Sequence, residues 1–111
     1  LFVAAAGNDS VNLDLTPTYP ACYDFENVIA VGATDDLDNN LYNWGPATVH
    51  LGAPGRQILS TIPYDTGGAR YAFSSGTSMA VPFVAGACAR SMVWLIHPTL
   101  TSLVRRALRS T

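Results

Sequence analysis

The amino-acid sequence predicts an α/β fold built around a mostly parallel sheet, and three segments support this prediction. Leu1 to Ala6 and Val28 to Ala33 are continuous apolar runs that are rich in small and β-branched residues. Such runs are typical of parallel strands that are buried on both faces. Ser78 to Ile96 is apolar on nearly every side of a helical wheel, which favours an enclosed helix at the centre of the fold.

The segments between these runs are rich in turn-forming residues. Asn8 to Asn27, which contains proline, tyrosine and asparagine, is predicted to be a loop. Asp35 to Asn40 and Gly52 to Gly55 are predicted to be polar turns. The first of these turns holds three aspartates but lacks the glycine and the distal glutamate of an EF-hand loop, so we expect a solvated turn there.

A β-hairpin is predicted between the second polar turn and the apolar helix. Gln57 to Ile62 and Arg70 to Phe73 read as its two arms. Residues 65–68, Asp-Thr-Gly-Gly, form the turn-forming cluster that joins the arms.

Two helices are predicted after the hairpin. Pro82 falls in the first turns of the apolar helix, where one missing N–H donor is tolerated. His97 and Pro98 are expected to mark the end of that helix. From Leu100 onward apolar residues recur at helical spacing, which predicts a separate amphipathic helix capped by Thr99.

Composition narrows the classes of function. Of the 111 residues, 49% are hydrophobic and 13% are charged, so the chain has material for the core of one domain. The formal net charge is -2, and nothing in the charge pattern suggests nucleic acid or an acidic membrane surface as a partner. Leu1 opens directly into an apolar run, which we interpret as a strand that has been cut into, and no targeting segment is expected.

The two cysteines, Cys22 and Cys88, fit neither a zinc-binding spacing nor a redox Cys-x-x-Cys motif. We expect them to serve as packing residues. Whether they form a disulfide is left open, because the geometry between the partners decides it.

Gly76-Thr77-Ser78 places a serine at a sharp turn before the apolar helix. A serine nucleophile needs such exposure, and free N–H groups at a helix N-terminus can bind the oxyanion that forms during attack on a carbonyl. Asn8 follows the first apolar run, at the expected carboxyl edge of the sheet, where α/β proteins place their sites. Its amide is able to donate to an oxyanion, and the alternative is a turn residue that bonds its own backbone.

Five segments, in their order along the chain, resemble motifs of the subtilisin-like serine protease family. They are Ala5-Ala6-Gly7-Asn8, Tyr19-Pro20-Ala21 followed by Asn27 to Ala33, Asn43-Trp44-Gly45, Leu51 to Gly55, and Gly76 to Ala80 followed by Pro82 and Val84-Ala85-Gly86. Each match alone is weak. Their common order over nearly the whole chain identifies it as a member of this family.

The resemblance implies a doubly wound, mostly parallel sheet of the subtilisin type with helices on both faces. Residues 1–111 would form the C-terminal portion of a single peptidase domain. The implied activity is that of a serine endopeptidase, in which Ser78 forms the acyl-enzyme and Asn8, with the Ser78 N–H, stabilises the oxyanion. The aspartate and histidine of the triad should precede Leu1, so this fragment alone is expected to be inactive.

The same resemblance implies substrate-binding residues. The walls of the primary specificity pocket are expected to come from Ala5, Ala6, Gly7, Tyr19, Pro20 and Ala21. Asp9 is expected near the mouth of that pocket, where a carboxylate would modestly favour basic or polar side chains of the substrate.

The expected partners are a polypeptide substrate and the remaining N-terminal part of the same domain, with no nucleic acid and no membrane. The family resemblance implies a secreted or extracytoplasmic protein. Relatives usually carry an aspartate at the position of His50, which helps to bind a weak calcium or monovalent cation. Because this chain has His50 there, we expect no metal site and no cofactor.

Two alternatives come from other classes of protein. A lipase or esterase would carry glycine in place of Ala80 and would have its histidine after the serine. A non-catalytic subtilisin-like binding domain stays open, because the residues that would distinguish it should precede Leu1.

Overall fold

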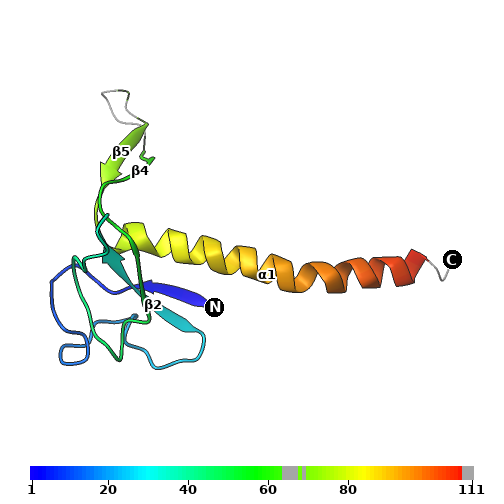
Figure 1. The fold of residues 1–111 in the computed structure, drawn as a ribbon, viewed down its shortest axis with the longest axis horizontal. Coiled ribbons are helices and arrows are strands. Elements are labelled where there is room, and N and C mark those ends of the chain that lie inside the picture. Colours follow the sequence, from blue (N-terminus) through cyan, green and yellow to red (C-terminus); the bar gives the residue numbers. More distant parts are fainter. Residues whose placement is uncertain (64–67, 69, 109–111) are drawn as a thin grey trace.

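The structure is a computed structural model that describes residues 1–63, 68 and 70–108 (Figure 1). Within these residues the chain forms, in order, β1 (Phe2–Ala5), β2 (Val28–Thr34), β3 (Leu51–Pro54), β4 (Ile58–Thr61), β5 (Tyr71–Ser74) and α1 (Thr77–Leu108). The first three strands make one sheet, and β4 and β5 make a second, two-stranded sheet. The result is the mixed α/β architecture that the sequence predicts.

The three-stranded sheet is parallel, with β2 between β1 and β3. Ala4 of β1 lies opposite Ala30 of β2, and Ala33 of β2 lies opposite Ala53 of β3. Because β2 has a neighbour on each edge and cover on each face, it is buried along most of its length, which explains its continuous apolar sequence. The two predicted strands are confirmed.

The polar turn predicted at Gly52 to Gly55 is wrong, because most of this segment belongs to β3. Gly52 lies opposite Gly32, and a Cβ at Gly52 would come within 2.9 Å of the Thr34 Cγ2 atom. The glycine therefore serves a close approach between strands. Pro54 is the last residue of an edge strand, a position where a missing N–H donor is tolerated.

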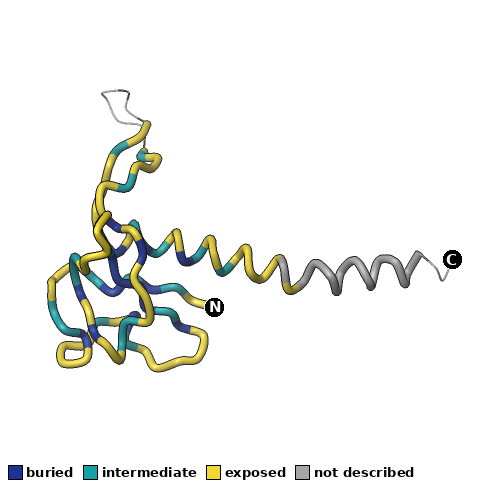
Figure 2. The backbone as a smooth tube through the Cα atoms, viewed as in Figure 1, coloured by how far each residue is buried: buried dark blue, intermediate teal, exposed yellow. Residues whose placement is uncertain are grey.

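The first turns of α1 pack against all three strands of the parallel sheet. Ala80 and Val84 of α1 form a buried cluster with Val31, Ala33 and Ala53. A second cluster joins strand residues to the loop between β1 and β2, and its members are Ala4, Ala6, Leu13, Ala21, Val28 and Ala30. Figure 2 shows that the buried residues gather where the sheet meets the start of α1 and its surrounding loops.

The two separate helices predicted for the C-terminal third are replaced by one continuous helix through Pro98. The fixed φ of proline is compatible with a helix, so Pro98 costs α1 one N–H donor and local crowding without ending it. The prediction of an enclosed helix holds only for its first turns. Further along, α1 extends beyond the sheet, and Met92, Val93 and Leu95 are largely exposed (Figure 1).

The Cα radius of gyration is 18.7 Å, against about 13 Å for a compact domain of this length. The difference reflects the length of α1 beyond the sheet and the projection of the β4–β5 hairpin. Helices on both faces, as in a doubly wound sheet, are not found among the described residues. One face of the sheet packs against α1, and loop residues such as Leu13 and Ala21 complete the other buried cluster.

The arms of the predicted hairpin are confirmed as β4 and β5, which pair antiparallel with Leu59 opposite Phe73. The turn predicted at residues 65–68 lies outside the described residues except for Gly68, whose φ of 78° is in the region that favours glycine. The hairpin matters for the site because β5 leads directly into Gly76 and the start of α1.

Candidate active site

Ser78 is exposed in the first turn of α1, as the Gly76-Thr77-Ser78 sequence predicts. The first N–H groups of a helix have no partner inside the helix. That of Thr77 donates to Asn8 Oδ1 at 2.9 Å, and that of Met79 donates to the Gly76 carbonyl at 3.0 Å. Within the described part of the chain no hydrogen bond is found for the N–H of Ser78.

Backbone hydrogen bonds tie the turn before Ser78 to the central strand. The Gly76 N–H donates to the Gly55 carbonyl at 2.8 Å, and the Gly55 N–H donates to the Thr34 carbonyl at 3.0 Å. A Cβ at Gly55 would lie 2.5 Å from the Ala33 Cβ and 2.8 Å from the Gly76 oxygen. Only glycine lets β3, β2 and the serine turn come this close together.

Asn8 lies directly beside this turn, with its amide held in one orientation. Its Oδ1 accepts two hydrogen bonds from Thr77, from the N–H at 2.9 Å and from the hydroxyl at 3.0 Å. Since both partners are donors, the oxygen must face Thr77, and Nδ2 is the atom left to donate elsewhere. A Cβ at Gly76 would lie 3.3 Å from Nδ2, so the glycine keeps this donor uncovered.

Two side chains that our sequence analysis assigned no role complete the site. Thr77 is almost fully buried, and its hydroxyl accepts the Gly7 N–H at 3.1 Å while donating to Asn8. Asn43 is fully buried and donates from Nδ2 to the Ala6 carbonyl at 2.8 Å. Both lie inside motifs that the sequence displays, Gly76-Thr77-Ser78 and Asn43-Trp44-Gly45, and their contacts become visible only in three dimensions.

The residues predicted to wall the specificity pocket differ in exposure. Ala6 and Ala21 lie in one buried cluster, so the structure brings the end of β1 and the Tyr19-Pro20-Ala21 segment together. Tyr19 is 59% exposed, and the peptide bond to Pro20 is cis. Ala5 and Gly7 are half-buried.

Ser78 opens into a cavity of about 280 Å³. Its lining is formed by Ile58, Ser60, Ser78, Met79, Pro82 and Phe83. The walls are therefore mostly apolar and include no histidine or carboxylate. A base for Ser78 is not supplied by the residues that line this cavity.

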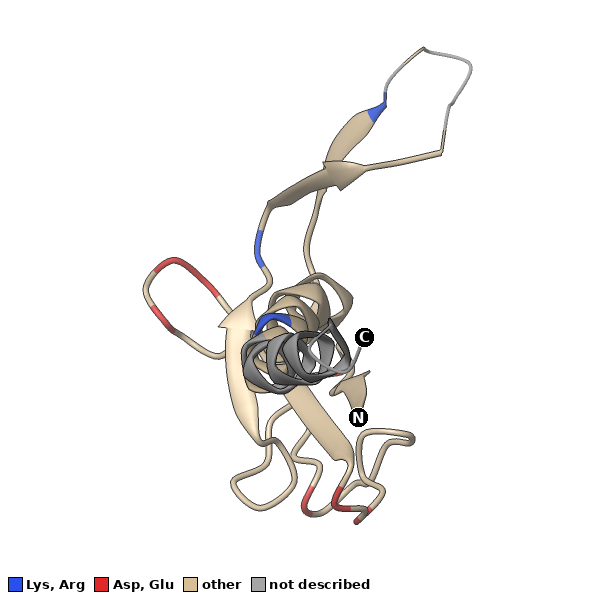
Figure 3. Ribbon diagram, turned by 90° about the vertical axis from the view of Figure 1, so that its right-hand side faces the viewer, with Lys and Arg blue, Asp and Glu red and all other residues tan. Residues whose placement is uncertain are grey.

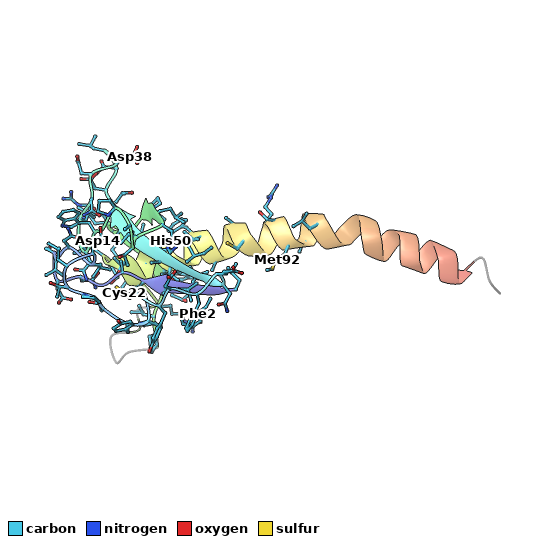
Figure 4. All side chains as sticks on the ribbon, turned by 90° about the horizontal axis from the view of Figure 1, so that it is seen from below. Phe2, Asp14, Cys22, Asp38, His50 and Met92 are labelled. Carbon is cyan, nitrogen blue, oxygen red and sulfur yellow. The ribbon has the colours of Figure 1, made fainter. Side chains whose placement is uncertain are left out.

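His50 lies elsewhere, and its ring is engaged in the sheet. The ring Nδ1 accepts the Ala30 N–H at 3.0 Å, and the backbone N–H of His50 donates to the Ala30 carbonyl at 3.0 Å. Its side chain lines a separate cavity of about 270 Å³ with Cys22 and Asp24. Figure 4 shows Cys22 and His50 among the loops around the sheet, whereas Met92 lies out along α1.

Among the described residues, Asp14 and Asp35 have a carboxyl pKa below the ordinary value of 3.8, and each accepts hydrogen bonds within a loop or between loops. The pKa of Asp14 is lowered mainly by a hydrogen bond from the Thr48 hydroxyl, 2.7 Å away, and next by one from the Ala47 N–H. The pKa of Asp35 is lowered mainly by hydrogen bonds from the side chain of Asn39, and the charge of Arg56 contributes least. The acidic residues that the structure describes lie in separate loops and not in one patch (Figure 3).

The predicted turn at Asp35 to Asn40 is confirmed, since the Asp35 N–H donates to the Asn39 carbonyl at 3.1 Å. In the described part of the chain no three His, Cys, Asp or Glu side chains are grouped so that they could hold a metal ion. Cys22 and Cys88 are not bonded to each other.

A serine at the start of a helix, with a fixed asparagine amide beside it at the carboxyl edge of a parallel sheet, is the arrangement of an α/β serine hydrolase. The family model that matches this chain is Peptidase S8, the subtilase family, and the match covers residues 1–109. The chain belongs to the subtilase family.

Named relatives agree with this assignment. The chain is 51% identical over 89 residues to the thermophilic serine proteinase of Bacillus sp. (strain AK1), covering 78% of this chain and 20% of that protein. It is 45% identical over 112 residues to subtilisin DY of Bacillus licheniformis, covering 98% of this chain and 38% of the relative. It thus spans well under half the length of these relatives.

Among solved structures, the prenylagaramide maturation protease PagA matches with a TM-score of 0.59 and 35% sequence identity. That match covers 78% of this chain and 29% of the PagA chain.

Relatives come from more than one compartment. One is an extracellular basic protease of Dichelobacter nodosus, 44% identical over 80% of this chain and 15% of that protein. Another is an intracellular serine protease of Paenibacillus polymyxa, 46% identical over 80% of this chain and 26% of that protein. Within the described residues, no helix has the length and apolarity that crossing a membrane requires.

Proposed function

We propose that the protein containing this chain is a serine endopeptidase that hydrolyses peptide bonds through an acyl-enzyme on Ser78. The observation that supports this most strongly is the pair of hydrogen bonds from Thr77 to Asn8 Oδ1. They leave Asn8 Nδ2 and the Ser78 N–H as two donors beside one exposed nucleophile. Together with family membership, this favours an oxyanion hole that is ready before substrate arrives.

In the proposed reaction, the Ser78 Oγ attacks the carbonyl carbon of the scissile peptide bond while a histidine takes the hydroxyl proton. The carbonyl oxygen becomes an oxyanion that accepts hydrogen bonds from Asn8 Nδ2 and the Ser78 N–H. The histidine then gives its proton to the leaving amine, the C–N bond breaks, and water hydrolyses the acyl-enzyme by the same route. Loss of one oxyanion donor costs about a hundredfold to a thousandfold in turnover, as the known example of a subtilisin shows.

The histidine and aspartate of this mechanism must come from other parts of the domain. The described residues that line the cavity beside Ser78 include no base, and apolar side chains of the sheet and of α1, such as Phe2, Leu51 and Phe83, are exposed. We therefore propose that residues 1–111 are the C-terminal portion of one peptidase domain and are inactive alone. Loss of the histidine removes about six orders of magnitude of turnover in a subtilisin.

The proposed substrate is a polypeptide. The side chain of the substrate residue that precedes the scissile bond would bind between two walls, formed by Ala5–Gly7 and by Tyr19–Ala21. Asp9 is exposed next to Asn8, so its carboxylate is available to a basic substrate side chain. An exposed ion pair of this kind contributes about 0.2–1 kcal/mol, which makes the preference modest. We propose a secreted or extracytoplasmic location, as for the extracellular relative.

A fluorophosphonate probe tests the assignment in the full-length protein. The probe reacts with an activated serine, so the wild type should be labelled and Ser78→Ala should not. Ser60→Ala is the matched control, because Ser60 lines the same cavity and its loss should leave labelling intact. Labelling that persists in Ser78→Ala, or an unlabelled wild type, would overturn the proposed function.

A further inference from the structure

We propose that Asn43 is a positioning residue for catalysis. It fixes the position of the Asn8 amide, the proposed donor to the oxyanion, by holding the main chain on both sides of Asn8. This inference rests on the proposed function and adds to it a residue that touches neither substrate nor the reacting atoms. The segment concerned is residues 6–11, called the oxyanion loop below.

The Asn43 side chain uses both of its polar atoms on the oxyanion loop. Nδ2 donates to the Ala6 carbonyl at 2.8 Å, before Asn8, and Oδ1 accepts the N–H groups of Asp9 at 2.8 Å and Val11 at 3.2 Å, after it. The backbone N–H of Asn43 adds a bond to the Gly7 carbonyl at 3.2 Å. One side chain therefore fixes the main chain on each side of the catalytic asparagine.

Burial makes these bonds expensive to lose. Asn43 has no exposed surface, and every buried side-chain nitrogen or oxygen in the described part of the chain has a partner. Each N–H or carbonyl that loses its partner without reaching water costs about 1–3 kcal/mol. Without Asn43 the oxyanion loop would move until water could reach these groups, and Asn8 would move with it.

Gly7 shows how closely Asn43 and the oxyanion loop fit. Its φ is 100°, and a Cβ there would come within 2.5 Å of Asn43 Nδ2. On the other side the Gly7 N–H donates to the Thr77 hydroxyl, which in turn donates to Asn8 Oδ1. Thr77 therefore orients the amide of Asn8, while Asn43 places the backbone that carries it.

The chemistry of the position calls for an amide. An aspartate keeps an acceptor for Asp9 and Val11 but has no proton for the Ala6 carbonyl when ionised, and an alanine makes none of the three side-chain bonds. Asparagine is the short side chain that donates and accepts at once.

The test is a double-mutant cycle between Asn43 and Asn8 in the full-length enzyme. Asn43→Ala, Asn8→Ala and the double variant are compared with wild type on one peptide substrate, and kcat is referred to active sites titrated with the fluorophosphonate probe. Asn43→Ala should lower kcat about tenfold to hundredfold with a smaller change in KM, since misplacing a catalytic group by about 1 Å costs on that order. In the Asn8→Ala background the same substitution should cost less than about threefold, because no donor is left to place.

Asn40→Ala is the matched control. Asn40 is an exposed asparagine three positions before Asn43, and its Nδ2 donates to the Tyr42 carbonyl at 3.0 Å. Its loss should leave kcat unchanged. If Asn43→Ala does not fold, the cycle is run with Asn43→Asp, which retains the two acceptor bonds.

A purely structural role would lower the melting temperature and the number of titratable sites while leaving kcat per site unaltered. The positioning role would be overturned if Asn43→Ala lowered kcat equally in the wild-type and Asn8→Ala backgrounds. It would also be overturned if Asn43→Ala caused no loss of kcat per active site in an otherwise active enzyme. A wild type that is inactive and unlabelled at Ser78 would overturn the proposed function, and this inference with it.

Discussion

Thr77 and Asn8 are joined by two hydrogen bonds that both end on the same oxygen, the Oδ1 of Asn8. The hydroxyl of Thr77 also accepts the Gly7 N–H, so one buried side chain links the backbone of Gly7 to the side-chain amide of Asn8. The direction of the Asn8 amide is thereby fixed without any contact to a substrate.

Thr77→Val tests this link. Valine keeps the shape of threonine but removes the hydroxyl, so Gly7 loses its acceptor and Asn8 keeps only the backbone donor. We expect kcat to fall about fivefold to twentyfold with KM nearly constant, as for the loss of one neutral hydrogen bond that acts in the transition state. Steady-state kinetics on a peptide substrate measure this. Thr77→Ser retains the hydroxyl and should stay close to wild type; a valine variant with wild-type kcat would contradict the role.

Gly55→Ala should destabilise the full-length protein by about 1–3 kcal/mol, the usual cost of overpacking. The added Cβ would lie 2.5 Å from the Ala33 Cβ and 2.8 Å from the Gly76 oxygen, and both of these residues are buried. Urea denaturation measures the loss. Gly52→Ala is the comparison, because its Cβ would meet only a Thr34 methyl group at 2.9 Å, so its loss of stability should be smaller.

His50→Phe should cost about 1–3 kcal/mol, because it leaves the N–H of fully buried Ala30 without its acceptor. His50→Asn provides an oxygen close to the position of Nδ1 and should recover most of this loss. The free energy of unfolding of the two variants decides between an acceptor role and simple packing. Equal losses in both variants would contradict the acceptor role.

Asp14→Asn should lower the melting temperature at neutral pH and have little effect in acid. The pKa of Asp14 is lowered in the folded protein, mainly by the hydrogen bond from the Thr48 hydroxyl. Its carboxylate therefore stabilises the fold at pH values above its ordinary pKa of 3.8. That stabilisation is lost as the pH falls through the lower folded value. Melting curves of wild type and variant from pH 7 to 3 should converge toward the acid end. Thr48→Val should reduce the gap, and a gap independent of pH would contradict this assignment.

Periodicity and motif order predicted the parts of the fold that local sequence controls. The buried strands β1 and β2 are visible as apolar runs, the hairpin arms as short apolar segments, and the start of α1 as the Gly76-Thr77-Ser78 sequence. β3 was missed because Gly52 and Pro54 have the composition of a turn. Their positions make sense only beside β2, because a Cβ at Gly52 would come within 2.9 Å of the Thr34 methyl group and Pro54 ends an edge strand.

The candidate site was predictable to a similar extent. Ser78 and Asn8 could be named because the family motifs contain them, and their catalytic roles stay predictions. Thr77 and Asn43 were not assigned because their roles depend on partners 69 and 37 positions away in the chain. No periodicity in the sequence reports such contacts.

The bonds from Gly76 to Gly55 and from Gly55 to Thr34 join main-chain atoms only. These bonds tie the turn before Ser78 to the backbone of the parallel sheet, and the Asn8 side chain holds the same turn from the other side through Thr77. The side chains that line the cavity beside Ser78, such as Ile58 and Phe83, take no part in these two bonds, so a change in their size or polarity would reshape the cavity without removing either bond.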